Sequence, residues 1–222
     1  MGKITPSKYF GVYSDGENFY TINGVPGFQV YGEVLKREGG KEYRRWNPKR
    51  SKLCAMLHKN LENFSFRENS SVLYLGAATG TTVSHISDIV LRGRIYAVEI
   101  SRTPFVDLLR LAEMRKNIFP IMTDASKTYT YASLITRVDV IYQDIAQKNQ
   151  VEIFVNAGNQ FLKKEGIGYL IIKAPAIDST KSIKEIIQIC IADLEERGFT
   201  IKERIFLDPF DEEHCGLVVK KK

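Results

Sequence analysis

Four polar residues in this sequence end or closely follow apolar runs that suit buried β-strands, and they are well placed to do chemistry. They are Glu99, Asp124, Asp144 and Lys173. Ligands of an open α/β sheet bind beyond the carboxyl ends of its strands. A lysine that closes an apolar strand is rarely left without a partner, so we expect Asp144 and Lys173 to pair across neighbouring strands. Asp124 could equally well cap a helix.

A glycine turn at Gly76 and Gly80 separates another buried run from a helical pattern. A strand, a glycine turn and a helix N-terminus in this order form a cradle for a nucleotide-like cofactor, because the helix offers unpaired N–H groups. Glu99, 23 residues after Gly76, is placed to accept hydrogen bonds from two ribose hydroxyls. The glycine spacing matches neither the dinucleotide fingerprint nor a phosphate-binding Walker loop, so an ordinary strand-to-helix turn is the alternative.

The rest of the chain alternates strand and helix patterns, which would bring these residues to one edge. Strands are predicted over 71–76, 94–99, 118–122, 138–143 and 167–173, and helices over 81–91, 103–116, 150–163 and 181–197. Two further strand-like runs, 200–207 and 216–220, close the chain. The predicted class is α/β, with a mostly parallel Rossmann-like sheet, helices on both faces and an antiparallel last strand.

Residues 1–46 differ from residues 47–222 in their pattern of residue types. Aromatic and β-branched runs near 9–13, 19–22 and 28–34 are separated by Asp-Gly and Asn-Gly turns, which indicates a small antiparallel sheet. Asn47 is a candidate N-cap and Pro48 a first helical residue, and apolar residues then recur at helical spacing through Phe64. We therefore predict a small N-terminal β domain over 1–46 and a larger domain over 47–222.

The positive charge of the chain is concentrated in one segment. Residues 36–52 carry eight Lys or Arg against two Glu, a net charge of +6 that equals the net charge of the whole chain. A localised basic segment is typical of a protein that binds a phosphate backbone. The alternative is a solvated surface stretch that binds no partner.

Several protein classes are excluded by other features of the sequence. No apolar run approaches the ~20 residues that span a bilayer, and the N-terminus lacks a signal-peptide core. The three cysteines, Cys54, Cys190 and Cys215, are odd in number and scattered, so they suit neither a disulfide framework nor a zinc site. We expect a cytoplasmic protein with no metal site and no membrane partner.

Four segments, in this order, resemble fibrillarin, the 2′-O-methyltransferase of box C/D RNA-guided particles, in its archaeal fibrillarin-like form. They are residues 42–53, 74–85, 138–147, and 173–174 together with 177–180. The chain has Thr79 where the family usually has Ser, Gln143 where a small or acidic residue is usual, and Lys148 where Pro is usual. None of these differences removes a group that the family's chemistry needs.

The resemblance implies S-adenosyl-L-methionine in the glycine cradle. Its carboxylate end would lie near Thr81 and Thr82, its ribose on Glu99, and its adenine by Asp124 and Ala125. A sulfonium cofactor has no phosphates, which agrees with a glycine loop that has no phosphate-binding lysine. The implied cofactor contacts are Gly76, Ala77, Thr81, Thr82, Glu99, Ile100, Asp124, Ala125, Asp144, Ile145, Ala146 and Gln147.

The resemblance also implies a catalytic tetrad. Methyltransferases of this fold that act on a ribose 2′-hydroxyl commonly use Lys-Asp-Lys-Glu, and fibrillarins are similar with His last, which here implies Lys52, Asp144, Lys173 and His214. A ribose hydroxyl has a pKa of roughly 12–13, so its attack needs a positioned base and a cationic surround. We expect Lys173 to assist deprotonation of the 2′-hydroxyl and Asp144 to orient Lys173. Lys52 would stabilise the alkoxide, and His214 would pack at the outer edge of the site.

The implied function is 2′-O-ribose methylation of rRNA and tRNA within a box C/D guide-RNA ribonucleoprotein. The implied partners are guide RNA and target RNA, a Nop-domain scaffold protein and a kink-turn-binding protein that resembles a ribosomal protein. From the basic segment we expect RNA contacts at Arg44, Arg45, Lys49 and Arg50. Two rival hypotheses remain: a guide-independent methyltransferase with another substrate, and a non-catalytic component of an RNA particle.

Overall fold

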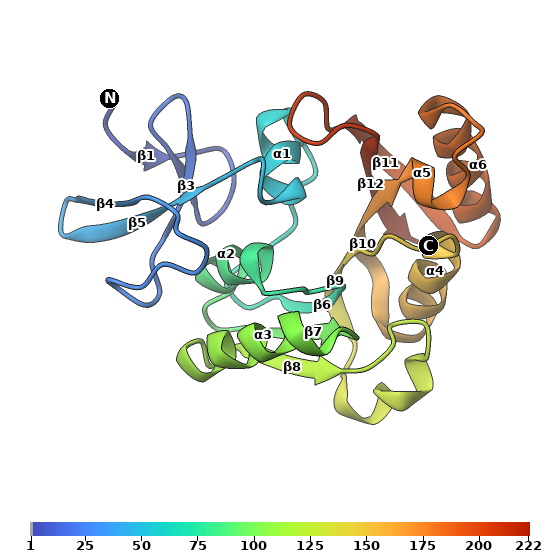
Figure 1. The fold of residues 1–222 in the computed structure, drawn as a ribbon, viewed down its shortest axis with the longest axis horizontal. Helices are drawn as coiled ribbons and strands as arrows, with labels where there is room; N and C mark the ends of the chain where they lie inside the picture. Colours follow the sequence, from blue (N-terminus) through green and yellow to red (C-terminus); the bar gives the residue numbers. More distant parts are fainter. Residues whose placement is uncertain (1) are drawn as a thin grey trace.

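The computed structural model describes residues 2–222, which form two separate β-sheets (Figure 1). The larger sheet has seven strands in the order β11-β12-β10-β9-β6-β7-β8. Its strands are β6 (Ser71–Leu75), β7 (Arg94–Glu99), β8 (Ile118–Met122), β9 (Val138–Asp144), β10 (Leu162–Lys173), β11 (Phe199–Phe206) and β12 (His214–Lys221). The pairs among β6 to β10 are parallel, and β12 is antiparallel to both of its neighbours. The predicted fold class, with its antiparallel last strand, is confirmed.

Helices cover both faces of this sheet, because alternate residues of each buried strand point to opposite sides. Val72 and Tyr74 of β6 pack in one apolar cluster with α1, α2 and α3, whereas Leu73 and Leu75 pack in a second cluster with α4 and α6. No helix within residues 2–222 is long and apolar enough to cross a membrane. The helices are α1 (Lys52–His58), α2 (Thr81–Ile89), α3 (Arg102–Met114), α4 (Gln150–Phe161), α5 (Ala174–Ile177) and α6 (Ile183–Glu196), with 3₁₀ turns η1 (Thr128–Thr130) and η2 (Ala132–Leu134).

The smaller sheet is antiparallel, as predicted, but three of its five strands lie outside the expected runs (Figure 1). Residues 28–34, expected as a strand, belong to the long loop between β3 and β4, and the basic segment instead provides the hairpin of β4 and β5. Gly39 and Gly40 have φ values of 57° and 74°, which allow the tight turn of this hairpin. The strands are β1 (Thr5–Pro6), β2 (Val12–Ser14), β3 (Phe19–Ile22), β4 (Leu35–Glu38) and β5 (Lys41–Trp46).

The helix predicted from Pro48 begins four residues later, at Lys52. Ser51 is its N-cap, and the Ser51 side chain accepts a hydrogen bond from the Cys54 N–H at 3.4 Å. The helix ends at His58, and Asn60 has a positive φ of 66°. The predicted start was wrong because a serine side chain, rather than Asn47, satisfies the first free N–H groups. Lys52 is consequently the first residue of α1.

A buried network of charged side chains joins the two sheets. The Arg44 guanidinium, on β5, donates to Glu33 Oε1 at 2.6 Å and to Asp88 Oδ2 of α2 at 2.7 Å. Arg115 also pairs with Asp88. Because Arg44 is fully buried, its guanidinium is not available to RNA, and its prediction as an RNA contact is wrong.

His85 of α2 completes this junction with neutral contacts. Its Nδ1 lies 2.8 Å from the Thr21 hydroxyl, and its Nε2 lies 2.8 Å from the Tyr31 hydroxyl. The imidazole stacks on Trp46 with ring centroids 4.8 Å apart. Burial, together with the positive charges of Arg44 and Arg115, holds the pKa of His85 well below its usual 6.5. The small sheet is therefore fixed on the larger one through polar contacts that are buried or partly buried.

Candidate active site at the carboxyl edge of the parallel strands

A cavity of about 220 Å³ opens beyond the carboxyl ends of β6, β7, β8 and β9. Nine of the twelve predicted cofactor contacts line it; the other three, Ala77, Thr81 and Thr82, do not. Ala78, Val98 and Thr123, which sequence reasoning did not name, are also part of its wall. The predicted residues in the wall are Gly76, Glu99, Ile100, Asp124, Ala125, Asp144, Ile145, Ala146 and Gln147.

The backbone at Gly76 explains why glycine stands at the start of the turn. Gly76 has a φ of 82°, and a Cβ added there would lie 2.3 Å from the backbone oxygen of Asp144. No other residue can take this conformation so close to a neighbouring chain without displacing it. The turn thus keeps the ends of β6 and β9 together beside the cavity.

Glu99 is fixed in place by the backbone. Its Oε2 accepts the Ala78 N–H at 2.8 Å, and its Oε1 accepts the Ser101 N–H at 2.7 Å. Each carboxylate oxygen keeps a second lone pair for another donor. This arrangement fits a cofactor that presents two ribose hydroxyls at the end of β7, and no phosphate-binding lysine lines the cavity in the described residues.

Asp124 both caps a turn and lines the cavity. Its Oδ1 accepts hydrogen bonds from the hydroxyl and the backbone N–H of Ser126, at 2.7 and 2.9 Å, and these bonds lower the pKa of the Asp124 carboxyl. A contact between Asp124 and an adenine ring stays a prediction.

Thr82 makes a contact that was not predicted. Its hydroxyl is buried and donates to the Ser51 Oγ at 2.9 Å. Ser51 is the N-cap of α1, so this bond links the first turn of α2, beside the glycine loop, to the helix that begins with Lys52. The cofactor contacts predicted at Thr81 and Thr82 are not tested by this geometry.

Charged residues from three elements meet next to this cavity. Lys52 Nζ donates to Asp144 Oδ2 at 2.9 Å and lies 3.6 Å from Asp211 Oδ2. Asp211 Oδ1 lies 2.8 Å from His214 Nδ1. Three predicted tetrad members, Lys52, Asp144 and His214, are thus connected, with Asp211 between two of them. Sequence reasoning missed Asp211, although its position three residues before His214 was a usable signal.

The expected pair between Asp144 and Lys173 does not form, because Asp144 pairs with Lys52 instead. The two residues do end neighbouring strands, as predicted, but Asp144 is opposite Ile171, so Lys173 lies two residues further along. Lys173 is opposite His214 on the other side. Gln150, which is fully buried, holds this strand end by bonding the Lys173 N–H at 3.1 Å and the Lys173 carbonyl at 3.3 Å.

The two lysines have different electrostatic surroundings. Burial disfavours the charged form of Lys52, but Asp144 and Asp211 outweigh it, so the pKa of Lys52 is raised. Within residues 2–222, no carboxylate lies within ion-pair distance of the Lys173 ammonium. Lys52 is held as a cation, whereas Lys173 is left for an incoming group.

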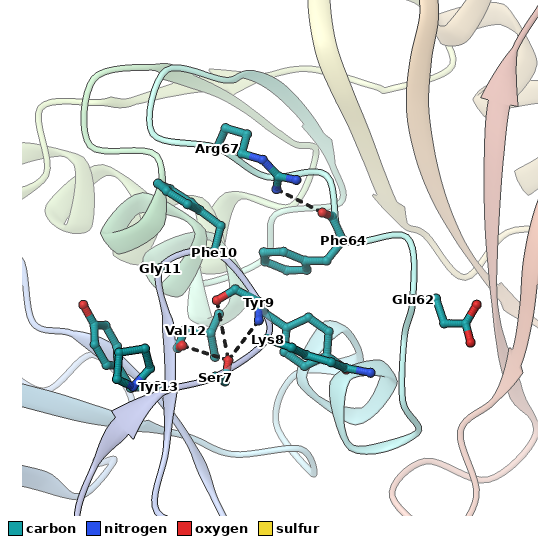
Figure 2. Close-up of a pocket in the computed structure, with 11 residues that line it drawn as sticks. Ser7, Lys8, Tyr9, Phe10, Gly11, Val12, Tyr13, Glu62, Phe64 and Arg67 are labelled. Atoms are coloured by element: carbon teal, nitrogen blue, oxygen red, sulfur yellow. Dashed lines mark hydrogen bonds between the residues drawn. The ribbon is translucent and has the colours of Figure 1, made fainter.

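A larger cavity, of about 540 Å³, lies on a different part of the molecule (Figure 2). The segment 6–13 and the loop after α1 line it. Figure 2 shows the Arg67 guanidinium engaged with the Phe64 carbonyl, a bond of 3.0 Å. No predicted site residue lines this cavity. Cavity size therefore does not locate the chemistry; the strand-end residues do.

The fold and the site are those of an S-adenosylmethionine-dependent methyltransferase, with a glycine turn, an acid at the end of β7 and a Lys-Asp pair at one edge of the sheet. The sequence model described as Fibrillarin matches residues 4–222. The chain belongs to the fibrillarin family. The predicted family and the predicted class of enzyme are confirmed.

Individual relatives agree with this assignment. The fibrillarin-like rRNA/tRNA 2′-O-methyltransferase of Methanopyrus kandleri is 46% identical over 214 residues, which cover 96% of this chain and 92% of the relative. Aeropyrum pernix fibrillarin, solved with natively bound S-adenosyl-L-methionine, superposes with a TM-score of 0.89 at 41% identity, covering 99% of this chain and 100% of the other. A fibrillarin/Nop5p complex contains a chain with a TM-score of 0.90 at 40% identity, covering 98% and 100%.

Proposed function

We propose that this protein methylates ribose 2′-hydroxyls of rRNA and tRNA as the catalytic subunit of a box C/D guide-RNA ribonucleoprotein. The observation that carries the proposal is the group of Lys52, Asp144 and His214 beside the cavity, in which Asp211 joins Lys52 to His214. Lys173, which has no ion-pair partner among residues 2–222, lies at the next strand end. The M. kandleri relative is named for the same activity on rRNA and tRNA.

Different residues of the chain have different roles in methyl transfer. When bound, S-adenosylmethionine supplies an electrophilic methyl group, whose bond to sulfur breaks as the 2′-oxygen bonds to its carbon. Lys173 contacts the 2′-oxygen and assists removal of its proton. Lys52, held as a cation by Asp144, stabilises the negative charge that develops on that oxygen. Asp144 thus orients Lys52, rather than Lys173 as the sequence suggested.

The basic segment brings the RNA to this edge. Arg45, Lys49 and Arg50 are exposed, and they lie in the segment of the chain that leads into α1, which begins at Lys52. Their positive charges would hold phosphates next to the first residue of α1, whereas base pairing with a guide RNA would choose the nucleotide. These three residues remain our proposed RNA contacts after the correction of Arg44.

We also propose the assembly in which this happens. A Nop-domain scaffold protein would recruit the enzyme, as the fibrillarin/Nop5p complex supports for a 40% identical chain. Guide RNA and a kink-turn-binding protein that resembles a ribosomal protein would complete the particle. The chain itself supplies the catalytic residues, so target choice would come from its partners.

The test is methylation of a target RNA with and without guide RNA and scaffold, followed by mapping of the modified nucleotide. We expect methylation at one paired nucleotide, and only when both partners are present. Methylation without guide RNA would contradict the assembly and favour a free-standing enzyme. Failure to bind S-adenosylmethionine in calorimetry would favour the non-catalytic rival.

The catalytic assignment is tested in the same assay by Lys173→Ala. Loss of a group that assists proton removal is expected to lower the single-turnover rate by about 100-fold. Lys164→Ala is the matched control, because Lys164 is an exposed lysine on the same strand. A Lys173→Ala rate within about threefold of wild type would show that Lys173 has another role.

A further inference from the structure

The two carboxylate oxygens of Asp211 face two different members of the site. Oδ2 lies 3.6 Å from Lys52 Nζ, and Oδ1 lies 2.8 Å from His214 Nδ1. The Asp211 side chain is 32% exposed, and the Lys52 and His214 side chains are 22% and 11% exposed. The family tetrad, as the sequence suggested it, gave no role to Asp211.

The loop that carries Asp211 is held firmly against the rest of the site. The N–H groups of Phe210 and Asp211 donate to the Leu207 carbonyl at 2.9 and 3.3 Å, and the Leu207 N–H donates to the His214 carbonyl at 3.1 Å. The Phe210 ring packs on the ring of His58, with centroids 5.3 Å apart. His58 is the last residue of α1 and Lys52 is the first, so this loop rests on the helix that carries Lys52.

The contacts of His214 determine which nitrogen carries its proton. Nδ1 lies 2.8 Å from both Asp211 Oδ1 and the backbone carbonyl of Glu212. A carbonyl oxygen can only accept, so the Nδ1 has to donate, and in the neutral ring Nε2 is left with a lone pair. His214 is also directly opposite Lys173 across β12 and β10. Asp211 therefore contacts Lys52 on one side, and on the other it contacts the histidine that lies opposite Lys173.

We propose that Asp211 is a positioning residue for methyl transfer: together with Asp144 it holds the Lys52 ammonium in place, and it fixes the orientation of the His214 ring. This inference rests on the proposed function. Asp211 exchanges no proton and touches neither the methyl group nor the RNA. The raised pKa of Lys52, to which Asp211 contributes after Asp144, agrees with this role.

The test compares Asp211→Asn with Glu212→Gln. Both substitutions remove one negative charge from the same loop, but the Glu212 side chain is exposed and makes no ion pair in the described residues. In the assembled particle we expect Asp211→Asn to lower the single-turnover rate about tenfold while the Kd for S-adenosylmethionine stays within about twofold. Asp211→Glu, which keeps the charge, should recover part of the rate. Glu212→Gln should react at the wild-type rate.

A spectroscopic readout in the free protein separates this inference from the proposed function. A hydrogen bond to a carboxylate is stronger than one to an amide, so the His214 Nδ1–H resonance should move upfield in Asp211→Asn and stay in Glu212→Gln. An unmoved resonance, or equal rate losses in the two variants, would overturn the role of Asp211. If the wild-type protein methylates no RNA while the resonance moves as expected, the proposed function fails and the positioning contact stands.

Discussion

Two clusters of opposite charges in this protein differ mainly in how much water reaches them. Arg44, Glu33, Asp88 and Arg115, at the junction of the sheets, have side chains that are 0–2% exposed. Lys52, Asp144 and Asp211, at the sheet edge, have side chains that are 22–32% exposed. The first cluster cannot meet a substrate and holds the two sheets together. The second remains accessible to molecules that bind at the sheet edge.

The same difference in burial decides what each cluster contributes to stability. A buried charge that loses its partner is solvated neither by water nor by a counter-charge, so the folded state is strongly destabilised. A half-exposed charge that loses its partner is solvated again, so the cost is small. The junction should therefore be sensitive in unfolding experiments, and the sheet edge in activity experiments.

The largest expected effect is the loss of stability in Arg44→Ala. The substitution leaves Glu33 and Asp88 buried with fewer counter-charges, and we expect a loss of about 3–5 kcal/mol in the free energy of unfolding. Urea unfolding followed by circular dichroism measures it. Arg45→Ala, at the exposed neighbouring position, and Asp144→Asn are the controls, and each should cost less than about 1 kcal/mol. Equal losses of unfolding free energy in Arg44→Ala and Arg45→Ala would show that burial does not decide the contribution of these charges to stability.

The second expected effect is a loss of stability in acid that depends on His85. Its pKa is lowered in the folded protein, so between the usual value of 6.5 and the folded value only the unfolded chain binds the proton. Stability from this group is present above about pH 6.5 and falls as the pH decreases, by up to ~1.4 kcal/mol per pH unit. Urea unfolding at pH 7.5, 6.0 and 5.0 should show this fall.

The contribution of His85 is isolated by substitution. His85→Gln should flatten the pH dependence between pH 6.5 and 5, whatever its stability at pH 7.5. His58→Gln is the comparison, because the pKa of His58 is also lowered, mainly by burial, but His58 is only partly buried. A pH dependence that His85→Gln leaves intact would mean that other groups carry it.

The smallest expected effect concerns the salt dependence of RNA binding. Replacing Arg45, Lys49 and Arg50 together with Ala should reduce the slope of log K against log salt by about 2, at ~0.7 for each contact with a single strand. The control is a triple Ala variant at exposed lysines on other elements, Lys164, Lys184 and Lys202, which removes the same charge. Equal slopes in the two variants would show that net charge, rather than the basic segment, governs binding.

Much of the site could be predicted because it depends on local order along the chain. Glu99 and Lys173 end buried strands, and parallel strands place such residues at one edge, where the cavity wall includes Glu99. Arg44 could not be assigned in this way, because whether a basic residue is buried depends on Glu33 and Asp88, which are distant in sequence. The start of α1 was missed for a smaller reason, the choice between two polar N-cap residues.

The class of fold, the glycine turn and the family could all be read from the chain alone, because strand periodicity, glycine positions and contiguous motifs are local properties. Which charges pair depended on how the chain folds in three dimensions. The fold placed Lys52 rather than Lys173 on Asp144, brought Asp211 between Lys52 and His214, and buried Arg44. Register between strands and packing between sheets set those distances, and residue types along one chain do not specify them.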